Sequence, residues 1–260
     1  MERRQLGTTG MEVPVIGMGT WRSFDTGDDR GPIVDEALAS GIDLFDSSPM
    51  YGRSEETLAK ALEGRRDRVK IATKIWTEDA GEGSRQAERA LALYGTVDIY
   101  QVHNLVNSAA QLALLERLKA EGRVRAIGAT HYREAAFGDL ADLMRTGRLD
   151  MVQIPYNPLR REAEKVLLPL AEELGLGVLV MSPLQDGILE RRPTQQQLRE
   201  LAVETWPEAV LKWIASDPRV CTVLTATKTP GRPAANARAG EPPMFNPEQR
   251  ELVGRICAAG

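Results

Sequence analysis

The sequence predicts an α/β protein, a (β/α)8 barrel of the TIM type with an N-terminal β-hairpin at the barrel floor. Short apolar segments alternate with amphipathic segments along the chain, an order typical of a parallel sheet with crossover helices. The apolar segments end near residues 20, 46, 74, 103, 130, 153, 182 and 225. The first six gaps between these ends span 23 to 29 residues, about one strand and one helix each. No boundary is evident, so we expect one barrel domain over residues 1–260.

An open, doubly wound sheet is the alternative arrangement of such units. It needs a G-x-G-x-x-G loop that follows the first strand and opens a helix. Gly17-Met18-Gly19 lacks the third glycine, and no helix begins directly behind it. We therefore expect the closed barrel.

The elements follow from local patterns. Residues 5–16 have turn residues between two extended segments, which predicts a hairpin. Apolar residues at helical spacing, such as Leu112, Leu115 and Leu118, mark the helices, and Ser54 is an expected N-cap. The expected strands are 16–20, 42–45, 69–74, 97–103, 125–130, 151–156, 177–182 and 220–225. The expected helices are 31–40, 54–62, 84–94, 109–120, 134–146, 161–174, 206–216, 233–239 and 246–259. A polar insert, residues 185–204, lengthens the seventh connection.

Composition excludes several classes of protein. Residues are 42% hydrophobic and 27% charged, as in ordinary globular proteins, and the net charge of −4 argues against a nucleic-acid partner. Cys221 and Cys257 form no disulfide framework, and no Cys-His spacing is typical of a metal site. No segment is apolar enough to span a membrane or serve as a signal peptide. We expect a cytoplasmic protein, a monomer or weak oligomer, without a membrane partner.

Three consecutive predicted strands end in groups that suit proton transfer. These residues are Asp46, Lys74 and His103, and Tyr51 lies in the loop after Asp46. The carboxyl ends of barrel strands form the functional face. A lysine ammonium near Tyr51 is expected to lower the pKa of the phenol. Asp46 would keep Lys74 charged, and His103 would hold a carbonyl oxygen against the tyrosine hydroxyl.

Each of these residues alone has an ordinary explanation. Asp46 is suited to cap a helix, Tyr51 to pack on a loop, Lys74 to face solvent, and His103 to serve structure only. Lys74 has a second chemical role open to it, as a Schiff-base amine. Their joint occurrence on neighbouring strands favours a site.

Three segments resemble the signatures of the aldo-keto reductases. They are Phe45–Gly52, Ala72–Lys74 and Tyr100–His103. Weaker similarities extend over nearly the whole chain, including residues 125–131, 152–157 and 181–184. The resemblance implies a (β/α)8 barrel and an NAD(P)H-dependent carbonyl reductase whose catalytic tetrad is Asp46, Tyr51, Lys74 and His103.

The resemblance also implies a set of cofactor-binding residues. They are Gly19, Thr20, Trp21, Thr130, His131, Gln153, Met181, Ser182, Pro183, Leu184, Thr227, Lys228, Thr229, Arg232 and Asn236. Three positions depart from the family pattern: His131 replaces an asparagine, Met181 replaces an aromatic residue, and Ala226 replaces a basic residue. Arg232 with Asn236 resembles the adenosine-phosphate site, which favours NADPH over NADH.

Trp21, Met50, Trp76 and Asn104 follow strand ends and are expected to line the substrate pocket. Three functions remain open from the sequence. The first is an NADPH-dependent reductase of small aldehydes or ketones with Tyr51 as proton donor. The others are a Schiff-base lyase that uses Lys74, and an NADP(H)-binding sensory or regulatory subunit with little turnover.

Overall fold

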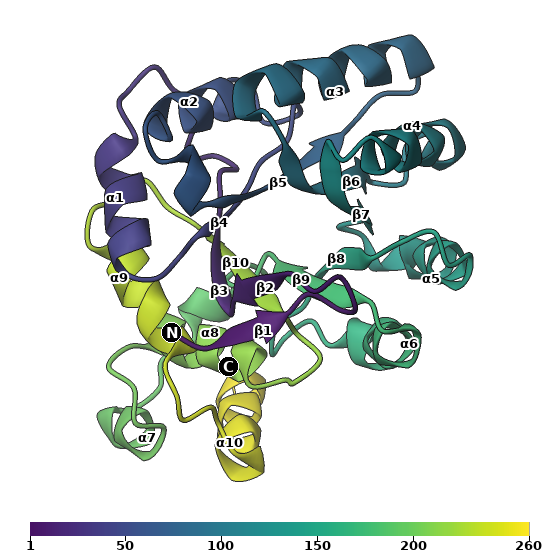
Figure 1. Cartoon of the computed structure of the whole chain (residues 1–260). Coiled ribbons are helices and arrows are strands. Elements are labelled where there is room, and N and C mark those ends of the chain that lie inside the picture. The colour runs from purple at the N-terminus through teal and green to yellow at the C-terminus, as the bar shows by residue number, and fades with distance from the viewer. Residues whose placement is uncertain (260) are drawn as a thin grey trace.

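The computed structural model describes residues 1–259 and contains a closed barrel of eight parallel strands. This confirms the predicted fold class. Each strand pairs with its sequence neighbour, and the last pairs with the first, in the order β10-β3-β4-β5-β6-β7-β8-β9 (Figure 1). The strands are β3 (Ile16–Gly19), β4 (Leu44–Asp46), β5 (Lys70–Ile75), β6 (Val97–His103), β7 (Val124–Thr130), β8 (Met151–Pro155), β9 (Gly177–Met181) and β10 (Thr222–Ala226).

Helices surround the strands on the outside of the barrel (Figure 1). They are α1 (Gly31–Ala39), α2 (Ser54–Ala61), α3 (Ala80–Tyr94), α4 (Ser108–Ala120), α5 (Phe137–Arg145), α6 (Leu167–Leu174), α7 (Gln195–Glu200), α8 (Trp206–Ala215), α9 (Arg232–Ala237) and α10 (Pro247–Ala258). Short 3-10 turns are η1 (Arg66–Arg68), η2 (Glu134–Ala136), η3 (Glu162–Glu164), η4 (Ile188–Glu190) and η5 (Arg238–Gly240). No helix within residues 1–259 is long and apolar enough to cross a membrane.

Helix boundaries differ from the expected ones where a cap decides them. The first turn of α3 begins at Ala80, four residues early, because the Asp79 carboxylate accepts a hydrogen bond from the Glu82 N–H at 2.6 Å. Ser54 is not the N-cap of α2 as expected; Arg53 holds that position, and the Ser54 hydroxyl donates to the Tyr51 carbonyl. The polar insert contains α7, which begins with a capping box between Thr194 and Gln197.

The barrel interior has an apolar half and a polar half. Side chains alternate across a strand with a period of two, so one face of each strand points inward. Toward the N-terminal end these inward side chains are apolar and form one buried cluster with apolar side chains of the N-terminal hairpin. The cluster contains Leu6, Met11, Val13, Leu44, Ala72, Ile99, Ala126, Met151, Leu179, Cys221 and Leu224. Two residues further along their strands, Lys74 and Gln101 continue the same face, so polar groups begin above an apolar floor.

The N-terminal hairpin closes that floor, as predicted. Its strands are β1 (Arg3–Gln5) and β2 (Glu12–Pro14), so the hairpin begins and ends two residues earlier than the expected 5–16, and Ile16 already belongs to β3. The Thr8 N–H donates to the Gly175 carbonyl, just before β9 begins. The Arg4 guanidinium donates to three carbonyls of the segment that leads into β10. These contacts fix the hairpin across the N-terminal end of the barrel and leave the opposite end open for a site.

Gly7 is required where the hairpin meets the barrel. It has a φ of +52°, and an added Cβ would lie 2.5 Å from Gly175 O and from Gly177 N. We expect Gly7→Ala to lower the free energy of unfolding by at least about 2 kcal/mol, because left-handed strain and a backbone clash add together. Urea denaturation measures the change. Gly10→Ala is the matched control, since Gly10 has φ +71° with nothing within 4 Å of its Cβ; equal losses would contradict the steric explanation.

Candidate active site

An ion pair lies at the polar end of the barrel interior. The Lys74 Nζ of β5 donates to the Asp46 Oδ2 of β4 at 2.6 Å and to the Ser47 carbonyl at 2.8 Å. Both charged side chains are buried. Burial alone lowers the pKa of Lys74, but the Asp46 carboxylate and Tyr51 outweigh it, and the net pKa is raised. Lys74 is therefore an ammonium held in a fixed direction.

Gln101 is a second partner of Asp46 that sequence reasoning missed. Its Nε2 donates to the Asp46 Oδ1 at 3.2 Å, so each carboxylate oxygen of Asp46 has its own donor. Gln101 pairs with Lys74 in the sheet register and lies two residues before His103 on β6. The period of two along that strand is the sequence signal that would have placed it on the inward face.

Tyr51 lies against both Lys74 and His103. The Lys74 Nζ is 5.2 Å from the centre of the Tyr51 ring, and the His103 ring stands perpendicular to it with centroids 5.8 Å apart. Burial raises the pKa of Tyr51, and the nearby Lys74 ammonium opposes the rise without cancelling it. The net direction is opposite to the lowering expected from Lys74 alone. The Tyr51 hydroxyl is consequently protonated at neutral pH.

His103 is buried and neutral. Burial, the Lys74 charge and His131 lower the pKa of His103 to about 3, so at neutral pH the ring carries one proton. Its Nδ1 lies 2.9 Å from the Ser48 Oγ, a contact with no signal in the sequence because Ser48 is simply one of two serines in the loop. The structure thus brings Asp46, Tyr51, Lys74 and His103 into one cluster.

The next strands present buried polar atoms that lack a partner. The Thr130 Oγ1 on β7 and the Gln153 Oε1 on β8 are buried without a hydrogen bond within residues 1–259. His103 pairs with Thr130, and Thr130 with Gln153, in the sheet register. His131 follows, and its Nδ1 accepts the Arg133 N–H at 3.0 Å. An unpartnered buried acceptor costs free energy, so a primary amide donor such as the nicotinamide carboxamide fits this place.

The remaining expected cofactor residues near the barrel mouth differ in exposure. Gly19, Thr20 and Pro183 are buried, whereas Trp21 is exposed and Met181, Ser182 and Leu184 are partly exposed. The Thr20 Oγ1 donates to the Ser47 Oγ at 2.9 Å, which ties the end of β3 to the loop that carries Tyr51. Ser182 has a φ of +56°, and its carbonyl accepts from Asn157.

The expected phosphate end lies on α9 and the loop before it. Arg232 and Lys228 are exposed, and neither forms an ion pair with a carboxylate of residues 1–259, whereas Asn236 is buried. Thr227 and Thr229 lie in the same loop, where the Thr229 N–H donates to the Thr227 Oγ1.

Glu36 is an acidic group near this end that the sequence did not indicate. Its carboxylate, on α1, accepts the N–H groups of Gly231 and Ala234 at 2.9 and 3.1 Å. The N-terminus of α9 is thus already capped by a carboxylate. The Lys228 and Arg232 side chains, and not the N-terminus of α9, are therefore available to bind an anion.

The expected substrate residues surround the open end. Trp21, Met50 and Trp76 are each 42% to 44% exposed in loops that follow β3, β4 and β5. The Gln86 Oε1 accepts the Trp76 N–H at 2.9 Å, and the Gln86 Nε2 donates to the Trp76 carbonyl at 3.1 Å. These two hydrogen bonds fix the loop that carries Trp76. Asn104 has a φ of +54° directly after His103.

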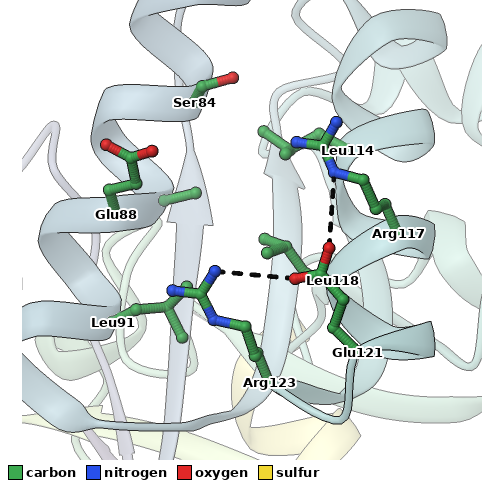
Figure 2. A pocket seen from close by; sticks show the side chains of 9 residues that line it. Ser84, Glu88, Leu91, Leu114, Arg117, Leu118, Glu121 and Arg123 are labelled. Carbon is green, nitrogen blue, oxygen red and sulfur yellow. Dashed lines mark ion pairs between the residues drawn. The ribbon is translucent and has the colours of Figure 1, made fainter.

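Two hollows lie outside the barrel and contain none of the tetrad residues. One, of about 240 Å³, lies between α3 and α4, and Figure 2 shows Glu121 between Arg117 and Arg123 at its rim. The other, of about 920 Å³, lies beside α8 and α10. Within residues 1–259, no group of three or more His, Cys, Asp or Glu side chains is placed to hold a metal ion.

Comparison with known proteins gives a consistent set of similarities. A family model described as "Aldo/keto reductase family" matches residues 15–256. "Aldo-keto reductase YhdN" of Bacillus subtilis is 30% identical over 75% of this chain and 66% of that protein. "NADH-specific methylglyoxal reductase" of Escherichia coli is 31% identical over 73% of this chain and 69% of that protein. The chain thus matches about two thirds of the length of these relatives. The solved holo form of aldo-keto reductase AKR11C1 from Bacillus halodurans is similar, with a TM-score of 0.80 and 26% identity over 98% of this chain and 96% of that chain.

Proposed function

The chain belongs to the aldo/keto reductase family, and from that premise we propose that it reduces small aldehydes or ketones to alcohols with NAD(P)H. One observation carries the proposal. A protonated tyrosine, a fixed ammonium and a neutral histidine meet at the open end of the barrel, next to unpartnered acceptors that suit a nicotinamide amide. We infer that the four tetrad residues act together on one carbonyl oxygen.

The roles follow from the protonation states. A nicotinamide cofactor bound at this place would supply the hydride that the carbonyl carbon receives. Negative charge then develops on the carbonyl oxygen, and Tyr51 donates its phenolic proton to that oxygen. The Lys74 ammonium stabilises the phenolate that remains, since it is held within 5.2 Å of the ring by Asp46. A neutral His103 has one N–H with which to orient the oxygen.

A Schiff-base lyase is the less favourable use of the same lysine. An amine attacks a carbonyl only when it is neutral. The Lys74 pKa is raised, and its Nζ donates to the Asp46 carboxylate and to the Ser47 carbonyl. The geometry therefore supports proton transfer and opposes covalent attack.

Cofactor binding uses the residues next to the tetrad. We propose that Gln153 and Thr130 accept hydrogen bonds from the carboxamide and that His131 donates to it. Gly19, Thr20 and the segment Met181–Leu184 would line the nicotinamide and pyrophosphate. Lys228 and Arg232 would bind the adenosine phosphate, with Thr227, Thr229 and Asn236 beside them. NADPH is the favoured cofactor on this basis, and NADH the alternative.

Arg232 provides the test of cofactor preference. We expect Arg232→Ala to raise the Kd for NADPH at least about tenfold, because charge-assisted hydrogen bonds to a phosphate contribute about 1.5–3 kcal/mol. The Kd for NADH should change little, since NADH has no 2′-phosphate. Fluorescence titration with each cofactor measures both values. Arg199→Ala, on the exposed face of α7, is the matched control; an equal loss for both cofactors would contradict a phosphate contact.

The proposed reaction is tested by loss of NADPH absorbance with an activated aromatic aldehyde. Turnover with alcohol as product is expected. Tight cofactor binding without turnover on any aldehyde or ketone would instead support a sensory or regulatory subunit. A covalent adduct on Lys74 after borohydride treatment with substrate would support the lyase.

A further inference from the structure

We propose that Ser48 is a positioning residue that fixes the tautomer of His103, with the single ring proton on Nε2. The proposal deepens the proposed function and rests on it for its effect on turnover. The tautomer itself is a property of the free protein and is measurable without any reaction. It matters because only a ring nitrogen that carries a proton can donate to a carbonyl oxygen.

The Ser48 hydroxyl has two neighbours and no solvent. Its residue is 0% exposed. The Met50 N–H donates to the Ser48 Oγ at 3.2 Å, and the Oγ lies 2.9 Å from the His103 Nδ1. Within residues 1–259 the Oγ has no other hydrogen-bond partner. These two contacts decide where the hydroxyl hydrogen points.

Counting protons separates the two tautomers. If the Nδ1 carried the ring proton, it would donate to the Ser48 Oγ, which already accepts from Met50. The Ser48 hydroxyl hydrogen would then be buried without an acceptor, which is costly. If the Nδ1 is bare, it accepts that hydrogen, and the Ser48 hydroxyl and the Nδ1 are both satisfied. The contacts therefore place the His103 proton on Nε2.

The same loop also sets the direction of the ring. Ser48 anchors the Nδ1 side, so the Nε2 side is left for a ligand. The Tyr51 N–H donates to the Ser48 carbonyl at 3.0 Å, and the two rings meet edge to face at 89°. Ser48 is thus bonded to both the proton donor's backbone and the orienting histidine. One residue controls the relative placement of these two groups.

Nitrogen-15 NMR of the histidine side chains reads the tautomer directly. The chain has only two histidines, so a His131→Asn variant assigns the remaining spectrum to His103. We expect the Nε2 of the full-length wild-type protein to give a protonated, pyrrole-type signal and the Nδ1 a bare, pyridine-type signal at pH 7. The reverse pattern, or averaged signals, would overturn the proposal.

Variants of Ser48 connect the tautomer to turnover. In Ser48→Ala we expect averaged ring signals and a kcat lower by about tenfold, the fold-change that one lost hydrogen bond produces. The Kd for NADPH should stay unchanged. Ser48→Thr keeps the hydroxyl and should restore the Nε2–H pattern and most of kcat. An unchanged spectrum and kcat in Ser48→Ala would overturn the assignment. If the protein reduced no carbonyl at all, the wild-type spectrum would still test the tautomer, so the two failures are distinguishable.

Discussion

Tyr51→Phe is expected to lower kcat for carbonyl reduction by about 10²–10⁴-fold, the contribution typical of a positioned proton donor. The change removes one oxygen and keeps the ring that lies beside Lys74 and His103. The Kd for NADPH should be little affected, because the phenol is assigned to the substrate oxygen. Steady-state NADPH oxidation and cofactor titration on the same protein separate the two effects. Turnover as fast as in the wild type would refute the role of Tyr51.

The matched control for this variant is Tyr94→Phe. Tyr94 is buried, whereas Tyr51 is partly exposed, and the Tyr94 hydroxyl donates to the Glu55 carbonyl at 3.0 Å outside the site. We expect a loss of about 1 kcal/mol in the free energy of unfolding from the lost hydrogen bond and an unchanged kcat. A similar fall in kcat for both variants would indicate that any buried tyrosine hydroxyl affects turnover indirectly.

The pH dependence of the wild type gives a further check on the same role. Reduction requires the protonated phenol, and burial raises the pKa of Tyr51 above its ordinary value of 10.0. The reduction rate should therefore stay flat through neutral pH and fall only above about pH 10. A fall in kcat between pH 7 and 8 would contradict the raised pKa of Tyr51.

The fold was predictable because the same strand-and-helix pattern recurs along the whole chain. Each strand and helix carries its own periodicity, and the spacing of strand ends indicates closure independently of any single element. The start of α3 was not predictable in the same way. Gly81 and Gly83 are poor helix formers, and the cap at Asp79 that overrides them is one hydrogen bond.

The candidate site was predictable where a strand end marks the residue. Asp46, Lys74 and His103 all end or nearly end their strands. Gln101 and Ser48 do not mark a strand end. The Gln101 side chain contacts Asp46, and the Ser48 side chain contacts His103. Such contacts depend on the three-dimensional register, which local sequence does not specify.

The direction of the Tyr51 pKa shift could not be predicted from the sequence. A lysine near Tyr51 predicts a lowered phenol pKa, and the structure gives a raised one because burial opposes it. The degree of burial depends on how closely the loop packs, which composition does not give. Glu36 is a similar case, since only the packing of α1 beside α9 brings its carboxylate to Gly231.

Lys74→Met is expected to lower the free energy of unfolding by about 3–5 kcal/mol and to abolish most turnover. Methionine has a similar volume, so the cost comes from Asp46, which would keep a buried charge without its ammonium. Urea denaturation at pH 7 measures the loss. A change below about 1 kcal/mol would show that Asp46 is adequately held by Gln101 alone.

The double variant Lys74→Met with Asp46→Asn separates stability from chemistry. Asparagine removes the unpaired charge and keeps an oxygen that can accept from the Gln101 Nε2. We expect the double variant to regain most of the lost stability, because a buried ion pair adds little net stability compared with a neutral replacement. Turnover should not return, since no cation then faces the phenolate of Tyr51. If turnover returned with stability, Lys74 would serve the fold and not proton transfer. If neither returned, the loss in Lys74→Met would have to come from packing, because the uncompensated charge would already have been removed.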